Sequence, residues 1–174
     1  MGGVSARDPG DEVADVVDGD DRVVGRATRR EIRAENLLHR AVAAMVRRST
    51  GDVFVHRRAE SKDVFPGMYD MFVAGMVGAG ESYEAAVARE LEEELGIEGA
   101  SAELALRHRY EGPLERAWSE VFAVRWDGPI RIDPVELAWG GWLTTDELDG
   151  RLSEWEFCPD SMEIFARGRH EGRW

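Results

Sequence analysis

The chain has 174 residues, of which 43% are hydrophobic and 33% charged, so it is long enough for one domain with a full hydrophobic core. Its net charge of −13 excludes nucleic acid and anionic membranes as partners held by bulk charge, and no apolar run approaches the ~18 residues that span a bilayer. One cysteine, Cys158, excludes an internal disulfide framework, and without a signal-peptide pattern we expect a cytoplasmic protein.

Hydrophobic patterning and turn residues predict a series of short strands with a few helices. Residues 1–11 are rich in Gly, Asp and Pro and are expected to be disordered, whereas residues 12–174 are expected to form a single domain. In chain order we predict strands at 13–18 and 22–28, a helix at 29–38, strands at 41–48 and 53–57, a helix at 83–95, strands at 102–110, 120–126 and 136–143, and helices from 144 and over 159–167. Strands interleaved with few helices predict an α/β fold in which helices cover both faces of a mixed sheet.

Three glutamates share one face of the predicted helix at 83–95. Glu90, Glu93 and Glu94 are spaced i, i+3, i+4, which at about 100° per residue places them within an arc of roughly 100°. Like charges this close repel one another, and hard oxygen ligands suit Mg²⁺ or Mn²⁺. The alternative is a solvated acidic face, as most glutamate runs are. We favour the metal site, from which Glu92 points away.

The ends and the apolar face of this helix indicate that it is anchored in a core. Ser82 is expected to cap its N-terminus, and Gly96 to end it. The apolar stripe next to the glutamates comprises Val87, Ala88, Leu91 and Leu95.

Residues 75–97 resemble the signature of the Nudix hydrolases. Its fixed positions are all filled, by Gly75, Glu81, Arg89, Glu90, Leu91, Glu93, Glu94, Gly96 and Ile97. The resemblance implies an α/β/α sandwich with a mixed β-sheet, and metal-dependent hydrolysis of a diphosphate bond in a nucleoside di- or triphosphate, or in a nucleoside diphosphate linked to another moiety. Mg²⁺ or Mn²⁺ would be the cofactor and a small diphosphate compound the partner. A homodimer is a further expectation, since such proteins often dimerise.

The resemblance also implies roles for individual residues of the signature. Glu90, Glu93 and Glu94 would be metal ligands, with the Gly75 carbonyl as another. Glu81 and Arg89 would brace the loop against the helix, so their role would be structural.

Hydrolysis of a diphosphate needs a carboxylate that takes the proton of the attacking water. Glu93 or Glu94 could serve. Outside the signature we favour Glu120, which opens an apolar strand pattern, although a solvent-facing strand end fits that position equally well. Glu111 and Glu115 lie in a loop that could also reach the site.

A basic segment follows the strand at 53–57 and stands out in an acidic chain. Arginine suits phosphate because its planar fork donates two parallel hydrogen bonds. We predict that Arg58 and Lys62 contact the substrate phosphates, and the alternative is a solubilising strand end.

Tryptophan is more often a core residue than a stacking partner for a base. Stacking on a base stays open as an alternative for one of Trp118, Trp139 and Trp142.

The resemblance extends to the isopentenyl-diphosphate isomerase branch of the same superfamily. Segments 38–41, 57–62 and 65–70 are similar to that branch, in which the residues matching Arg58 and Lys62 hold the diphosphate.

The isomerase reaction needs a Cys-Gly-His triplet just before the signature helix, and this chain has Ala74-Gly75-Met76 there. Alanine carries no proton, and methionine does not replace an imidazole on a hard metal. Glu120 does match the second acid of the isomerase, but Trp118 stands where that enzyme has an acidic ligand. A nucleotide-binding sensor without activity is a third interpretation, but such proteins usually lose the glutamate cluster, which is intact here. A hydrolase is therefore the favoured interpretation.

Overall fold

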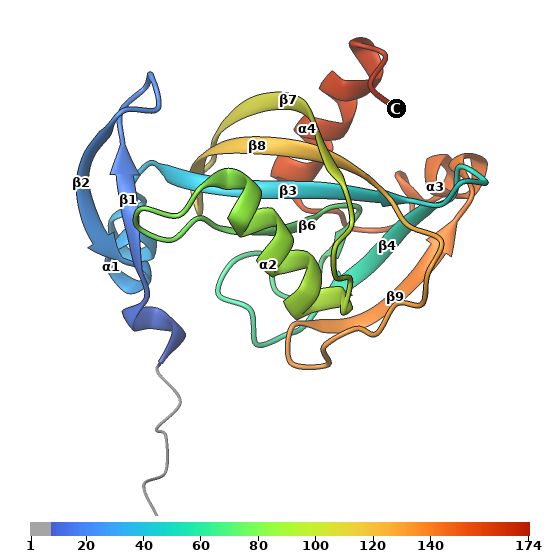
Figure 1. Ribbon diagram of the computed structural model, residues 1–174, viewed down its shortest axis with the longest axis horizontal. Coiled ribbons are helices and arrows are strands. Elements are labelled where there is room, and N and C mark those ends of the chain that lie inside the picture. The colour runs from blue at the N-terminus through green and yellow to red at the C-terminus, as the bar shows by residue number, and fades with distance from the viewer. Residues whose placement is uncertain (1–7) are drawn as a thin grey trace, which may run out of the picture.

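The fold is built around β3 (His39–Arg47), the central strand of a mixed sheet, in a computed structural model that describes residues 8–174. β3 pairs in parallel with β8 (Arg116–Arg125) and antiparallel with β6 (Val73–Met76). Nine strands of the described residues form one sheet. Figure 1 shows β3 running through the middle of the molecule, with β8 beside it.

The other elements follow the predicted order along the chain. They are η1 (Pro9–Asp11), β1 (Val13–Val17), β2 (Val23–Thr28), α1 (Arg29–Glu35), β4 (Val53–Arg58), β5 (Tyr69–Asp70), α2 (Tyr83–Leu95), β7 (Ala102–Glu111), β9 (Leu137–Leu143), α3 (Thr145–Arg151) and α4 (Pro159–His170). β7 extends the sheet beyond β8, and β9 pairs antiparallel with β4. None of the helices in residues 8–174 is both long and apolar enough to cross a bilayer.

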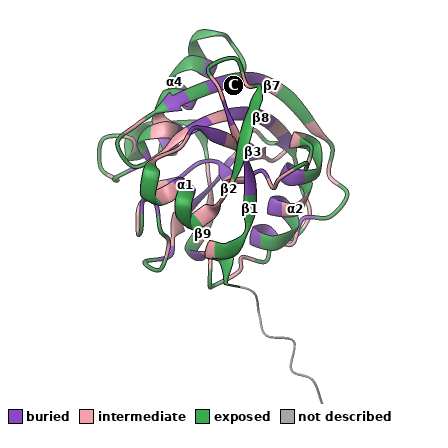
Figure 2. Ribbon diagram, turned by 90° about the vertical axis from the view of Figure 1, so that its left-hand side faces the viewer, coloured by how far each residue is buried: buried purple, intermediate pink, exposed green. Residues whose placement is uncertain are grey.

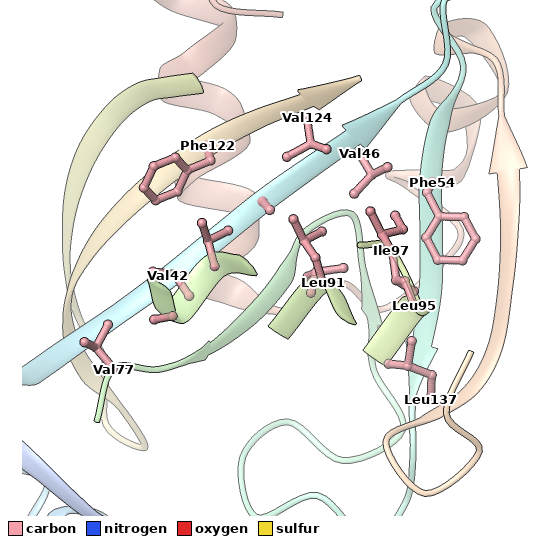
Figure 3. Packing of buried hydrophobic residues seen from close by; sticks show 14 residues of the cluster. Val42, Val46, Phe54, Val77, Leu91, Leu95, Ile97, Phe122, Val124 and Leu137 are labelled. Carbon is pink, nitrogen blue, oxygen red and sulfur yellow. The ribbon is translucent and has the colours of Figure 1, made fainter. Parts of the chain in front are cut away.

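Alternate residues of β3 supply two separate hydrophobic cores. Val42, Ala44 and Val46 pack with residues of α2 on one face of the sheet, and Figure 3 shows Leu91 and Leu95 pointing toward them. Ala43 and Met45 face the other side, where the core includes residues of α3 and α4. Successive side chains of a strand point to opposite faces, so β3 is buried on both. The predicted α/β/α sandwich with a mixed sheet is confirmed.

Local signals fix both ends of α2, as expected. The Ser82 side chain accepts a hydrogen bond from the Ala85 N–H at 3.1 Å. Gly96 adopts a left-handed conformation with φ 66° and closes the helix through its N–H. The apolar stripe differs in one member, because Ala86 is buried and Ala88 is exposed. Figure 2 shows the buried face of α2 turned inward, while β2 is exposed along most of its length.

Three features of the described chain differ from the sequence prediction. Residues 1–7 of the segment predicted to be disordered lie outside the described residues, but Pro9–Asp11 form a short 3-10 helix because the Asp8 side chain caps it. β5 and β6 were not predicted, since two to four residues are too few to show an alternating pattern. β8 begins at Arg116, four residues before the predicted start.

Candidate active site

The pair Glu81–Arg89 joins the turn before α2 to the helix itself. Arg89 donates from Nε and Nη2 to the two oxygens of Glu81, each at 3.0 Å. Its Nη2 also donates to the Met76 carbonyl at 3.1 Å, and Glu81 accepts the Gly78 N–H at 2.8 Å. The guanidinium therefore lowers the pKa of Glu81. These bonds connect the turn to α2, and the structural role that the resemblance implies for the pair stays a prediction.

Gly75 makes room for the Glu90 carboxylate. A Cβ built on Gly75 would lie 1.9 Å from Glu90 Oε1 and 2.0 Å from Cδ, closer than any real contact. The carboxylate thus lies directly against the backbone of β6, which only a glycine at this position permits. Two residues that are 15 positions apart in the signature are placed in contact, and both line one cavity.

Glu90 and Glu94 form a buried carboxylate pair at the inner side of α2. Their relative exposures are 9% and 3%. Burial raises the pKa of both, and repulsion from Glu90 helps to raise that of Glu94 to about 8, although Lys62 and Arg58 act in the opposite direction. Two buried carboxylates that repel each other match the hard-oxygen ligands that Mg²⁺ and Mn²⁺ prefer.

Glu93 takes a different position from its two neighbours. Its side chain is exposed and accepts a hydrogen bond from Arg89 Nη1 at 3.3 Å, while the same nitrogen donates to Glu90 at 2.6 Å. In residues 8–174 no three His, Cys, Asp or Glu side chains converge closely enough to enclose a metal ion. The residues that fit a metal here are Gly75, Glu90 and Glu94, and Glu93 lies at the rim of the same cavity.

Arg58 and Lys62, which we predicted to contact phosphate, both line the same cavity, and the phosphate contact itself stays a prediction. Arg58 is largely buried and donates to the Val64 carbonyl from Nε at 3.2 Å and Nη2 at 2.9 Å, which fixes its guanidinium. Lys62 bonds the carboxylate of Glu136. Arg57, the adjacent arginine, instead turns to Gly67 and Glu60. The basic segment is thereby divided into one cavity-facing pair and one outward-facing residue.

The cavity has a volume of about 820 Å³ and a second acidic wall opposite α2. Asp70 is buried and accepts hydrogen bonds from Ser161 Oγ at 2.7 Å and the Phe72 N–H at 2.8 Å. Burial and the charge of Asp70 raise the pKa of Asp160 to about 8, and Asp160 Oδ1 is buried without a hydrogen-bond partner. Glu115 also lines this wall. The inner wall is polar, with hydrogen-bonding capacity left for a ligand.

Two carboxylates of the loop before β9 line the cavity, and no motif in the sequence predicts them. Asp133 and Glu136 lie 39 and 42 residues beyond Glu94, in a segment without a recognisable motif. Backbone hydrogen bonds bring the loop to the helix: the Arg131 N–H donates to the Leu95 carbonyl and the Asp133 N–H to the Glu94 carbonyl, both at 2.9 Å. Only the tertiary structure shows this proximity.

Glu120, the predicted outside base, does not line the cavity, whereas its neighbour Ser119 does. Glu120 is buried at 5% exposure on the same face of the sheet as Val42 and Phe122, and it accepts a hydrogen bond from Arg107 of the neighbouring strand β7. Glu111 pairs with Arg109 and Arg116 away from the cavity, whereas Glu115 reaches it.

None of the described tryptophans considered for base stacking lines the cavity; they are Trp118, Trp139 and Trp142.

Cys158 is buried beside Asp70, and burial raises the pKa of its thiol, so it is an unreactive core residue. Ala74 and Met76 both line the cavity. The positions that hold Cys and His in the isomerase branch therefore face the site here without carrying an ionisable group.

Comparison with known proteins agrees with the signature and its geometry. The NUDIX domain model matches residues 37–163. The chain belongs to the Nudix hydrolase family. An uncharacterized Nudix hydrolase from Streptomyces coelicolor is 49% identical over 161 residues, which cover 91% of this chain and 89% of that protein. The uncharacterized Nudix hydrolase YfcD from Escherichia coli K12 is 36% identical over 155 residues, or 89% of this chain and 85% of YfcD.

Solved structures show the same Nudix fold. The crystal structure of DR0079 from Deinococcus radiodurans superposes with a TM-score of 0.76 at 31% identity, covering 90% of this chain and 98% of that one. A MutT protein from Methanosarcina mazei has a TM-score of 0.66 at 23% identity, with 79% of this chain and 96% of that chain covered, and it is similar in fold alone.

Proposed function

We propose that this Nudix hydrolase cleaves the diphosphate bond of a nucleoside di- or triphosphate, or of a nucleoside diphosphate linked to another moiety, with Mg²⁺ or Mn²⁺. One observation carries the proposal: the buried pair Glu90 and Glu94 faces the same cavity as Arg58 and Lys62. A diphosphate and a divalent cation together satisfy both sets of charges. The cavity volume of about 820 Å³ lies within the range of small-molecule sites, roughly 300–1,000 Å³.

Each group of the cavity then has a part in the reaction. Glu90, Glu94 and the Gly75 carbonyl would hold the metal, which when bound supplies positive charge for the phosphates and a more acidic water. Arg58 and Lys62 hold the phosphate oxygens and fix the phosphorus for in-line attack. The Glu81–Arg89 pair keeps the turn and α2 in register, so that the carboxylates stay aligned.

Isomerisation of a prenyl diphosphate is the competing activity, and the cavity wall argues against it. A double-bond shift needs one group that donates a proton and another that removes one. Ala74 occupies the wall position where the isomerase branch has its cysteine, and it has no proton to give. Asp70 and Asp160 form a polar wall, and a hydrocarbon chain packed against it would bury these carboxyl groups without offering them hydrogen bonds.

The test is a panel of diphosphate compounds assayed with Mg²⁺ and with Mn²⁺, in which phosphate release and prenyl products are measured in parallel. The wild type should hydrolyse at least one nucleoside diphosphate derivative only when the metal is present. Glu94→Gln should lower kcat by about 100-fold or more. Glu92→Gln, on the exposed side of the same helix, is the matched control and should retain wild-type rates. Full activity of Glu94→Gln, or none in the wild type, would refute the assignment.

A further inference from the structure

The contact between Lys62 and Glu136 occupies a group that the substrate also needs. Lys62 is the only lysine in the chain, and its ammonium bonds the Glu136 carboxylate across 74 residues of sequence. Both side chains line the cavity that contains Glu90 and Glu94. Because Glu136 neutralises the ammonium, a phosphate that binds there competes with the Glu136 carboxylate for its charge and its three N–H donors.

Backbone hydrogen bonds hold the Glu136 main chain in place. The Asp133 N–H donates to the Glu94 carbonyl at 2.9 Å, and the Asp133 carbonyl accepts the N–H groups of Glu136 at 3.1 Å and Leu137 at 2.8 Å. On the other side, the Glu136 carbonyl accepts the Ala59 N–H at 2.9 Å. The residue is thus fixed between the C-terminal end of α2 and the end of β4, independently of its own side chain.

The other acidic groups near the metal-binding end of the cavity already have partners that the substrate does not displace. Glu81 and Glu93 accept from Arg89, and Asp133 Oδ1 accepts the Val135 N–H at 2.9 Å. In the described part of the chain, Lys62 is the sole hydrogen-bond partner of the Glu136 carboxylate. Removal of Lys62 would therefore leave a carboxylate free beside the phosphates.

We propose that Glu136 exchanges its lysine for the attacking water and is the general base of the reaction. In the substrate-free protein the carboxylate neutralises Lys62. When the diphosphate binds, its oxygens draw the ammonium away, and the freed carboxylate takes one proton from the water. The water oxygen forms the new bond to phosphorus, the bridging P–O bond breaks, and the leaving phosphate departs with the electron pair. This inference rests on the proposed function, because it assumes hydrolysis of a diphosphate.

Steady-state kinetics separate a base from a mere partner of the lysine. Glu136→Gln should lower kcat by roughly 100-fold or more, and the remaining rate should rise with pH as hydroxide replaces the base. KM should stay equal or fall, since Lys62 is no longer held. Glu136→Asp should restore part of kcat, and Asp133→Asn should lower it by much less than Glu136→Gln does. If Glu136→Gln keeps the wild-type kcat and only KM falls, Glu136 holds the lysine without acting as a base.

The exchange itself is measurable without turnover. Reductive ¹³C-methylation labels the single lysine and keeps its charge, and the Lys62 signal is identified by its loss in Lys62→Arg. Inorganic pyrophosphate should move the wild-type signal toward the position it has in ligand-free Glu136→Gln. A wild-type signal that stays in place at saturating pyrophosphate overturns the exchange. A wild type that hydrolyses no diphosphate refutes the proposed function instead, and the lysine signal still reports whether the exchange occurs.

Discussion

At the scale of single residues, the Glu90 carboxylate lies so close to Gly75 that position 75 has no room for a side chain. Because the carboxylate occupies the space where a Cβ would stand, the shape of this end of the cavity depends on the absence of a side chain at Gly75. Gly150, in contrast, has room for a methyl group, since a Cβ there would meet nothing within 4 Å.

Gly75→Ala should therefore displace the Glu90 carboxylate and leave the rest of the fold intact. A displacement of about 1 Å costs roughly 100-fold in rate, so we expect at least this loss in kcat/KM and weaker binding of Mn²⁺ by calorimetry. Gly150→Ala, in the exposed part of α3, is the control and should gain about 0.5–1 kcal/mol of stability with unchanged kinetics. Normal metal affinity in Gly75→Ala would contradict this account.

At the scale of single elements, the residues that cap its two ends set the length of α2. Gly96 lies at φ 66°, and its N–H together with that of Ile97 satisfies the last carbonyls of the helix. The loop that carries Asp133 contacts this end of the helix, because the Asp133 N–H donates a hydrogen bond to the Glu94 carbonyl. The helix end thus determines both where Glu94 lies and where the loop attaches.

Gly96→Ala should destabilise the protein by about 1–2 kcal/mol, because an alanine pays a steric penalty in the left-handed region. Gly96→Asn should recover part of that loss, since asparagine tolerates this conformation better. Urea unfolding of the two variants and the wild type gives the comparison. Equal stability of the alanine and asparagine variants would show that backbone strain is not the cause.

The difference between features that could and could not be predicted from the sequence is also clearest for single elements. α2 could be predicted because its cap, apolar stripe and closing glycine lie within fifteen residues, and the signature spacing places Glu90 and Glu94 on it. Glu136 could not, because its position depends on hydrogen bonds to α2 and β4 rather than on nearby residues. Glu120 looked suitable in sequence, but it pairs with Arg107 of the neighbouring strand and does not line the cavity. Local signals define elements, whereas the cavity is assembled from distant ones.

At the scale of the whole molecule, buried ionisable groups link folding to pH. His56 is completely buried two residues before Arg58, and burial, aided by the charges of Arg58 and Lys62, lowers its pKa to about 3. The unfolded chain takes up this proton below about pH 6.5, and the native protein does not. This histidine therefore contributes stability that is present at high pH and is lost as the pH falls from about 6.5 toward 3.

Comparison with His56→Gln isolates that contribution, because the carboxylates with raised pKa titrate in both proteins. The stability difference between wild type and variant should change by about 2 kcal/mol in the variant's favour between pH 8 and pH 5. Urea unfolding at the two pH values measures it. A difference that is independent of pH would mean that His56 is protonated in the native protein.

The parallel pairing of β3 with β8 has a consequence for how the chain folds. His39 pairs with Ala117 and Arg47 with Arg125, so every contact of this ladder closes a loop of 78 residues. During synthesis β3 leaves the ribosome long before its partner exists, with apolar residues on both faces and one edge unpaired. Any fragment that ends before residue 117 should expose that edge and aggregate. The fold must therefore be completed late, when β8, the second strand after the Nudix signature, has been synthesised.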